Sequence, residues 1–574
     1  MPPTIPTTRP ASTSSARLSP LRELEQVHRN YGPGHADSKI VLLDALATQR
    51  LPTARAVERL HEVLCFLRAS PDSEGVLTRV QRMLSGFADR PDLRRHATAL
   101  MDTGMAGTPT FYSFFYPTAQ WLAARWPSQL TVSWEDLEHP ERLERILHLL
   151  GLHAETPGFD ELALPVRDWI RRMKGPGETD AVFLLRRMAA IKADVEVRES
   201  VFEDLGIMFK LAASPDTPNR THGYLPPKRV HFVTRPLATT RPDLRRVLRR
   251  RRPTITAVSG DEGQRLIDLA REAMVARARD LDAFAYGDPN DVRVIDCGHG
   301  LEFVAVGLVP ERRLLLEAVY GFLTLMNGAP VGYVLSSALY GSAEVAFNVF
   351  DTFRGAEAAQ VYGQTLAVLR HLFGATAFTI YPYQLGGAGN KEGLHSGAWW
   401  FYQKLGFRPE DPEAIALMEA ELAQMRKKPG YRSSRGTLRR IGEYNMYYHL
   451  GKSRPDVIGK IPLPNVGLAV TDMVAHRFGA DRDEGERVLE GEMVHLLGAG
   501  ARRGWTIGER LGFRRWAPLA AALPGVADWP LADRRALAEV MRAKGGRRES
   551  DFVRQFDSHR RLRRALHRLA RDTE

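Results

Sequence analysis

The sequence predicts a mixed α/β fold at its centre, over 255–410, with a largely antiparallel sheet and with all-α regions on both sides. Two observations predict it. Over 21–225 and 411–574 the apolar residues recur every three or four positions, which is the period of an amphipathic helix. Over 255–410 short apolar segments alternate with turn residues and helices, which is typical of a sheet with connecting helices.

Length and composition narrow the class of protein. The chain has 574 residues, of which 44% are hydrophobic, so it can bury several cores. Its two cysteines, Cys65 and Cys297, lie far apart, which excludes a disulfide framework and a Cys-rich metal site. We therefore expect no metal and a cytoplasmic location. No apolar run reaches about 18 residues, so we expect no membrane span.

Charge is concentrated in two segments, although the net charge of +12 is modest for this length. Residues 226–254 are rich in proline and arginine, with seven arginines from Arg241 to Arg252, and predict a domain junction. A last helix carries Arg554 to Arg568 beside leucines. We interpret both runs as solvated helix faces, since like charges repel one another; contact with nucleic-acid phosphates is the alternative.

The N-terminal part begins with a tail and continues with helices. Residues 1–20 are rich in Ser, Thr and Pro and lack the apolar core of a secretory signal, so we expect a disordered tail. From 21 to 225 the pattern is helical, as in the series Val57, Leu60, Leu64.

The first half of the α/β region predicts a series of antiparallel strands. After a strand at 254–259 and a helix over 260–285, extended segments follow at 292–309, 320–326, 330–340 and 343–353. Asn327-Gly328 between two of them is a hairpin turn signal, because both residues tolerate a positive φ.

The second half predicts a strand, helix, strand unit. A helix runs through Tyr362 and Leu366 and ends at Gly374, and a strand follows at 377–385. From Glu410 to Met425 the pattern is helical again, so the sheet ends early or another segment completes it.

The turn before this helix has the features of a phosphate site. The segment reads Val349-Phe350-Asp351-Thr352-Phe353-Arg354-Gly355-Ala356-Glu357-Ala358-Ala359. Backbone N–H groups at a helix start have no partner within the helix, and the helix dipole adds positive charge. Such a start can hold a pyrophosphate.

A second motif follows the 377–385 strand: Ser396-Gly397-Ala398-Trp399-Trp400-Phe401-Tyr402-Gln403-Lys404-Leu405-Gly406-Phe407-Arg408-Pro409. Ser396 is expected to cap the start of a helix and Gly406 to take a left-handed conformation at its end. Phe407 is expected to fold back onto the last turn.

Together the two motifs, in this order, resemble those of the GNAT superfamily of N-acetyltransferases. The first position in that family usually reads Arg-Gly-x-Gly-x-Gly or Ala; Gly355 and Ala359 agree, whereas Glu357 stands at the middle glycine. A carboxylate there repels a pyrophosphate unless it points away. The resemblance implies that acyl-CoA, acetyl-CoA in particular, is bound by these residues: Val349, Phe353, Arg354, Gly355, Ala356, Ala358, Ala359 and Tyr402.

The resemblance also implies catalytic roles. Tyr402 stands where many family members use a tyrosine to return a proton to the coenzyme thiolate; simple packing is the alternative. A base is needed because an amine is mostly protonated near pH 7. We prefer Glu344, since the family often has an acidic base on this strand, over Asp351 and His395; a solvated carboxylate at a strand end is the alternative for Glu344.

These observations predict an acyl-CoA-dependent N-acyltransferase that acts on an unidentified amine. The alternative is a degenerate GNAT module that serves in binding or assembly, and a third reading is a helical scaffold that contacts nucleic acid. Gly451-Lys452-Ser453 is not a nucleotide-binding loop, because Met446 stands where that motif requires its leading glycine.

Overall fold

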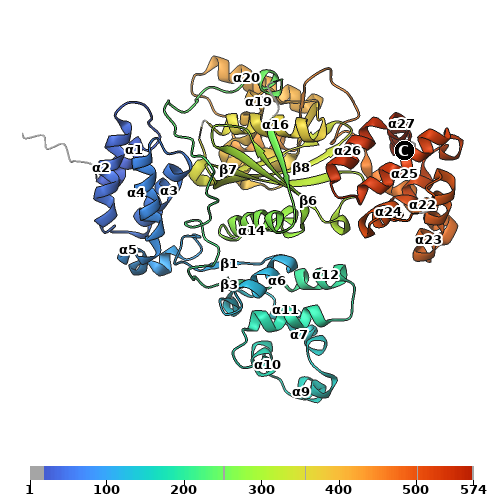
Figure 1. Cartoon of the computed structure of the whole chain (residues 1–574), viewed down its shortest axis with the longest axis horizontal. Helices are drawn as coiled ribbons and strands as arrows, with labels where there is room; N and C mark the ends of the chain where they lie inside the picture. Colours follow the sequence, from blue (N-terminus) through green and yellow to red (C-terminus); the bar gives the residue numbers. More distant parts are fainter. Residues whose placement is uncertain (1–18, 250–252, 356, 501, 572–574) are drawn as a thin grey trace, which may run out of the picture.

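The computed structural model describes residues 19–249, 253–355, 357–500 and 502–571. A central sheet lies between two helical regions, with the first helices at one end and the last helices at the other (Figure 1). The mixed α/β centre and its helical flanks are therefore confirmed. The predicted disordered tail, up to residue 18, and Arg250 to Arg252 of the junction lie outside the described residues.

The first helices form a small bundle, which shares a core with one face of the central sheet. Their apolar stripes meet at Leu24, Leu60 and Val80, all fully buried. Thr53 and Ser73 cap two of them by accepting bonds from backbone N–H groups. The helices are α1 (Pro20–Val27), α2 (His35–Thr48), α3 (Ala54–Ala69), α4 (Glu74–Ser85) and α5 (Pro91–Arg95).

The rest of the region predicted as helical contains a small sheet, so the all-α prediction for 21–225 is wrong in this part. Its strands pair antiparallel in the order β1 (Thr110–Tyr112), β3 (Phe209–Leu211), β2 (Leu130–Val132). Strands of three residues are too short for an alternating pattern to stand out. The helices around it are α6 (Tyr116–Arg125), α7 (Pro140–Arg145), α8 (Leu147–Leu150), α9 (Thr156–Glu161), α10 (Val166–Met173), α11 (Asp180–Ala190) and α12 (Val195–Leu205).

The predicted junction crosses the molecule as an extended segment tied by hydrogen bonds. Leu225 N donates to Gly328 O at 2.9 Å, and Val233 N donates to Pro71 O at 2.8 Å. It ends in α13 (Leu244–Leu248), which buries its three apolar residues while Arg245, Arg246 and Arg249 are exposed. The described arginines of this run therefore lie on a solvated face.

The strands of the central sheet follow the order β12-β13-β11-β9-β8-β7-β6-β5-β4, and β10 also pairs with β8. Each pair is antiparallel except β9 with β11. The strands are β4 (Thr254–Val258), β5 (Gly287–Asp296), β6 (Leu301–Leu308), β7 (Ala318–Met326), β8 (Ala329–Leu339), β9 (Ser342–Glu344), β10 (Ala346–Val349), β11 (Ala377–Ile380), β12 (Arg408–Pro409) and β13 (Met446–His449).

Helices cover both faces of this sheet (Figure 1). On one face α16 (Ala358–Phe373) shares a hydrophobic core with the sheet, which includes Leu366, Val334 and Phe378. On the other face α14 (Asp261–Val275) lies against β5 and shares a core with the sheet that includes Ile267 and Leu323, next to the short α15 (Asp282–Ala285). The alternation of strand residues decides which face each side chain occupies.

Two turns predicted from the sequence are present, one at the end of a strand and one at the end of a helix. Asn327 (φ 46°) and Gly328 (φ 77°) form the hairpin between β7 and β8. Gly374 (φ 71°) ends α16 in the left-handed conformation. The strand predicted over 377–385 stops at Ile380 instead, because Pro382 begins the helix α17 (Pro382–Leu385).

The second sequence motif forms two helices rather than one. Ser396 ends α18 (Lys391–Ser396), and Gly397 (φ 65°) separates it from α19 (Ala398–Lys404), so the predicted capping role of Ser396 is wrong. The end of α19 is as predicted: Gly406 has φ 104°, and Phe407 N donates to Tyr402 O at 3.1 Å.

The sheet does not stop at residue 410. After α20 (Pro412–Lys427) and α21 (Arg435–Gly442), the chain returns as β13, which pairs antiparallel with both β11 and β12. The region predicted as all-α over 411–574 therefore contains one strand of the central sheet. Four residues among long helices carried too little pattern to reveal it.

The C-terminal helices form a bundle that docks on the sheet through α26, next to β7 and β8. They are α22 (Leu463–Phe478), α23 (Arg482–Leu497), α24 (Ile507–Ala522), α25 (Leu531–Lys544), α26 (Glu549–Ser558) and α27 (Arg560–Arg571). In α27 Leu562 and Leu566 are buried while most of its arginines are exposed, in agreement with the predicted solvated face. Among the described residues, every helix is too short or too polar to span a bilayer.

Candidate active site between helix α16 and the central sheet

The strand that precedes α16 consists of β9 and β10, and it separates from the neighbouring strand β11 halfway along its length. Its pairing with β8 keeps one register from Ser342 to Val349. Its parallel pairing with β11 covers only β9, and Val345 N makes the last bond, to Thr379 O at 3.1 Å. Within the described residues β10 therefore has β8 as its one strand partner, and its other edge is free of ladder bonds.

A 3₁₀ turn, Asp351–Phe353, leads from β10 to the start of α16. Glu357 precedes the first helical residue, and its Oε1 accepts a hydrogen bond from Arg29 Nη1 at 2.8 Å. Arg29 Nη2 also donates to the carbonyl of Arg354 at 3.1 Å. Arg29 follows α1, so the N-terminal bundle supplies a cation to the turn. The charge of Glu357 is thus compensated from outside the α/β region.

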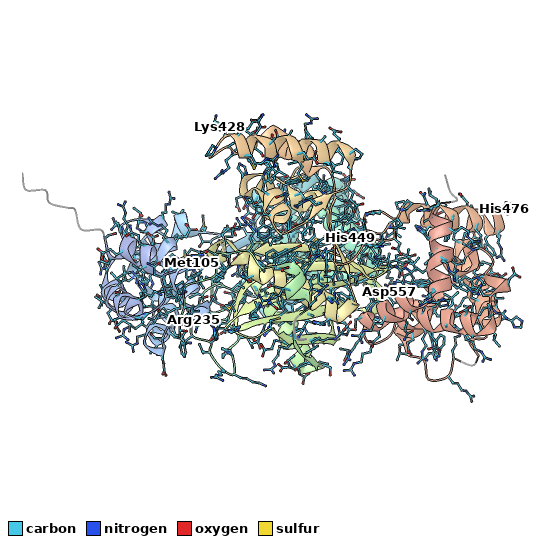
Figure 2. The ribbon with its side chains drawn as sticks, turned by 90° about the horizontal axis from the view of Figure 1, so that it is seen from above. Met105, Arg235, Lys428, His449, His476 and Asp557 are labelled. Carbon is cyan, nitrogen blue, oxygen red and sulfur yellow. The ribbon has the colours of Figure 1, made fainter. Side chains whose placement is uncertain are left out.

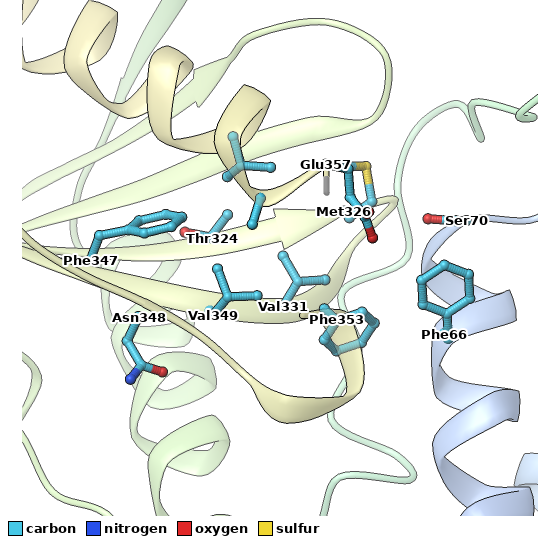
Figure 3. A pocket seen from close by; sticks show the side chains of 13 residues that line it. Phe66, Ser70, Thr324, Met326, Val331, Phe347, Asn348, Val349, Phe353 and Glu357 are labelled. Atoms are coloured by element: carbon cyan, nitrogen blue, oxygen red, sulfur yellow. The ribbon is translucent and has the colours of Figure 1, made fainter. Parts of the chain in front are cut away.

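A cavity of about 40 Å³ lies beside this turn, between the sheet, α16 and α3 (Figure 3). Apolar side chains dominate its lining. One polar side-chain atom at its wall, Thr324 Oγ1, is buried without a hydrogen-bond partner among the described residues. Such an atom is costly to bury, so it marks a place where a ligand group or water is accepted.

Most of the residues predicted to bind the coenzyme surround the turn. Val349, Phe353 and Ala358 line the cavity. Arg354 is exposed and pairs with Asp351 at 2.8 Å and with Glu392. The remaining predicted residues differ: Gly355 lies against Arg29 and Glu357, Ala359 is buried in the core, and Ala356 lies outside the described residues.

The turn fits a diphosphate in charge and in chain geometry. Arg29 offers a planar guanidinium, and the start of α16 offers the positive end of a helix dipole. Gly355 lies close to the ends of the Arg29 and Glu357 side chains, so a larger residue there would push this ion pair aside. The Glu357 carboxylate occupies the place of an anion, and a bound phosphate would take over its bond to Arg29.

Tyr402 lies behind the cavity and does not line it. It is 3% exposed, and its ring packs against Tyr362 at 5.4 Å and Phe407 at 5.9 Å between centroids. Burial raises its pKa, so the phenol stays protonated at neutral pH. This placement agrees with the packing role that the sequence left open, and it puts a proton donor one side chain away from the cavity wall.

Tyr362 stands between Tyr402 and the cavity. Its ring contacts Phe347, which lines the cavity, at 5.1 Å, and its hydroxyl is fully buried without a hydrogen-bond partner among the described residues.

We expect Tyr362→Phe to raise the free energy of unfolding by about 1 kcal/mol, because it removes an unsatisfied buried hydroxyl. Urea denaturation measures the change. Tyr320→Phe is the matched control: the Tyr320 hydroxyl bonds Asp291 and accepts from Ser550 N at 2.9 Å, so its removal should destabilise. A loss of stability in Tyr362→Phe would show that its hydroxyl has a partner.

Glu344 occupies the opposite face of the sheet from Tyr402. Its Oε2 accepts a bond from Ser337 Oγ at 2.9 Å, on the adjacent strand β8. Glu317, just before β7, and Tyr381, just after β11, are its electrostatic neighbours. It is partly buried and hydrogen-bonded beside the point where β10 leaves β11, whereas the alternative interpretation expected a solvated carboxylate at a strand end.

Two carboxyl groups with raised pKa values therefore meet in this place. Burial raises the pKa of Glu344; the Ser337 bond lowers it and the charge of Glu317 raises it further. Burial also raises the pKa of Glu317. A carboxylate whose pKa is raised toward neutrality is a better proton acceptor than a solvated one, and a pair of them attracts a cationic amine.

The other candidate bases lie elsewhere. The Asp351 side chain is 83% exposed and pairs with Arg354. His395 is exposed on α18, where its Nδ1 contacts Lys391 O at 2.7 Å. Neither is buried as Glu344 is.

Three residues of the site were not anticipated from the sequence: Arg29, Glu317 and Tyr362. Glu317 could have been found, because the Asn327-Gly328 hairpin sets the register that puts Val319 opposite Ser337, and Glu317 shares that face. Arg29 could not, since it lies 328 residues from Glu357 and no local pattern connects them.

Comparisons with protein-family models, with curated proteins and with solved structures gave no match. Function is therefore inferred from the two motifs and from the geometry of the residues around them.

Proposed function

We propose that this chain is an acyl-CoA-dependent N-acyltransferase of GNAT type, which transfers an acyl group, acetyl in the simplest case, to an amine. One observation carries the proposal. The partly buried Glu344 lies where β10 parts from β11, on the strand that leads directly into the turn before α16. A thioester held between that turn and the parted strands would bring its carbonyl to Glu344.

Bound acyl-CoA would supply the electrophilic thioester carbonyl. Glu344 accepts a proton from the amine as the new C–N bond forms, and Glu317 adds negative charge that favours a cationic acceptor. When the C–S bond breaks, the sulfur takes up a proton. Tyr402 is proposed as its source, since burial keeps the phenol protonated; its hydroxyl has to reach the sulfur past Tyr362.

Calorimetric titration with acetyl-CoA and with free CoA tests the proposal. A micromolar dissociation constant, about −8 kcal/mol, would support it and would justify a screen of amine acceptors. No heat of binding for either coenzyme up to millimolar concentration would reject it.

Arg29 gives a sharper test of the same site. We expect Arg29→Met to weaken coenzyme binding ~10-fold to 100-fold, because a charge-assisted bond to phosphate is lost. Arg22→Met is the matched control, since Arg22 is an exposed arginine on α1, the helix just before Arg29. Equal affinities of the two variants in the same titration would remove Arg29 from the site.

One observation favours the second candidate, a degenerate GNAT module kept for binding or assembly. Glu357 and Arg29 already neutralise each other at the start of α16. If this pair has replaced the coenzyme, Glu357→Gly should not create binding. If it only competes with phosphate, Glu357→Gly should tighten binding of acetyl-CoA, because the competing carboxylate is gone.

A further inference from the structure

A second groove, of about 340 Å³, lies at the other end of α16. Arg370 in the last turn of α16 lines it, 13 residues from Glu357, which is about 20 Å along the helix. The other lining residues come from the position just before β11, from the end of β13 and from the segment after it: Thr376, His449, Leu450, Gly451, Lys452 and Arg454. Figure 2 places His449 on the side of the sheet toward the C-terminal helices.

The groove presents more positive than negative charge. Arg370 Nη1 is buried without a hydrogen-bond partner among the described residues, and Lys452 is exposed. No ion pair involves either of them in the described part of the chain. Arg454 is held at 2.7 Å by Asp456 and at 2.5 Å by the carbonyl of Tyr340. Two uncompensated cations and one fixed guanidinium thus face the same space, which favours an anion.

His449 adds a directional polar group. Its side chain is 10% exposed, and its Nε2 lies 3.2 Å from Glu410 Oε1. Burial raises the pKa of Glu410, but the hydrogen bonds and charge from Lys460, His449 and Ser453 together lower it. Glu410 therefore accepts the hydrogen bond as a carboxylate, with the ring proton on His449 Nε2. The buried Nδ1 is left without a partner among the described residues. The lone pair of Nδ1 can therefore accept a hydrogen bond from an O–H group of a ligand.

We propose that this groove binds a phosphate group, free or as a phosphate monoester, through Arg370, Lys452 and Arg454. Singly protonated phosphate, either the free ion HPO₄²⁻ or the monoanion of an ester, carries the negative oxygens that guanidinium groups prefer. It also carries a P–OH that can donate a hydrogen bond to His449 Nδ1. An added Cβ at Gly451 would meet nothing within 4 Å, so the chain leaves the approach open. The phosphate would be recognised by side chains. A nucleotide-binding loop holds phosphate with its backbone N–H groups instead, and the Gly451-Lys452-Ser453 segment does not form such a loop.

Calorimetric titration of the full chain with inorganic phosphate, in a buffer without other oxyanions, tests the inference. We expect saturable binding with a dissociation constant of about 1 mM or tighter. Arg370→Met should weaken it ~10-fold or more, and Lys452→Met ~3-fold, since a charge-assisted bond to a half-buried arginine exceeds one to an exposed lysine. Lys428→Met is the control, because Lys428 is exposed and lies away from His449 in Figure 2.

Titration with other ligands shows whether the site binds the free phosphate ion or a phosphate ester. Tighter binding of ribose 5-phosphate than of phosphate would identify an ester as the ligand, and equal binding would identify the free ion; both support the site. Sulfate, which has no O–H at neutral pH, should bind more weakly. Absence of saturation up to ~10 mM phosphate, or equal affinity in wild type, Arg370→Met and Lys452→Met, would overturn the inference. Because Lys452 is exposed, Lys452→Met should fold and should still report the affinity for phosphate if Arg370→Met unfolds.

Discussion

Glutamine in place of Glu344 is expected to lower the rate of acyl transfer by ~10²-fold or more, because general base catalysis contributes that much. The substitution keeps the size of the side chain and the bond from Ser337 but cannot accept a proton. The measurement is the rate of thiol release from acetyl-CoA with an active amine acceptor.

The pH dependence of this rate identifies the base. Glu344 is active only when ionised, so the wild-type rate should rise as pH climbs through its pKa, which burial raises above the usual glutamic acid value. Glutamine at position 344 should abolish this rise of the rate with pH, which is the acidic limb of the pH–rate profile. Ser337→Ala is the matched control: the Ser337 bond lowers the pKa of Glu344, so its loss should move the limb to higher pH. An unchanged profile in Glu344→Gln would remove Glu344 from the mechanism.

Stability separates lost chemistry from lost folding in this variant. Because the folded-state pKa of Glu344 is raised, ionising the carboxyl costs free energy in the folded state, and this cost is present above the folded pKa and absent at low pH. Glutamine carries no such cost. Glu344→Gln should therefore be at least as stable as wild type at pH 8, by thermal unfolding, while it is inactive.

Methionine in place of Lys544 is expected to lower the free energy of unfolding by about 3–5 kcal/mol. Lys544 Nζ and Glu549 Oε1 are 2.5 Å apart, and the two side chains are 5% and 0% exposed. Nζ also donates to Glu317 O at 2.8 Å, and Glu549 Oε2 accepts from Val319 N at 3.3 Å, so the pair joins the C-terminal bundle to β7. Without Lys544 a buried carboxyl group loses its counter-charge.

Two controls isolate this effect in urea denaturation. Arg561→Ala breaks the ion pair with Asp533, whose side chains are 44% and 37% exposed, and should cost under ~1 kcal/mol. The double variant Lys544→Met with Glu549→Gln should recover much of the loss, since no buried carboxylate remains. A change within ~1 kcal/mol for Lys544→Met alone would mean that water reaches Glu549 and that this junction is open.

Local signals in the sequence identified the parts of the fold that depend on few neighbouring residues. The hairpin at Asn327-Gly328 and the helix end at Gly374 followed from residues that tolerate a positive φ. The helix period of α16 followed from Leu366 and its neighbours. Where the expected strand over 377–385 was wrong, a local signal, Pro382, had been present and decided the matter.

The sequence by itself thus determined most strands and helices of the central α/β region, its mixed sheet, and the turn from β10 into α16, because period and turn chemistry act within a few residues. The tertiary structure decided what faces that turn. It put Arg29 against Glu357, Glu317 beside Glu344, and β13 into the sheet. These contacts depend on how whole helices and strands pack, and side chains hundreds of residues apart leave no mark on each other's local pattern.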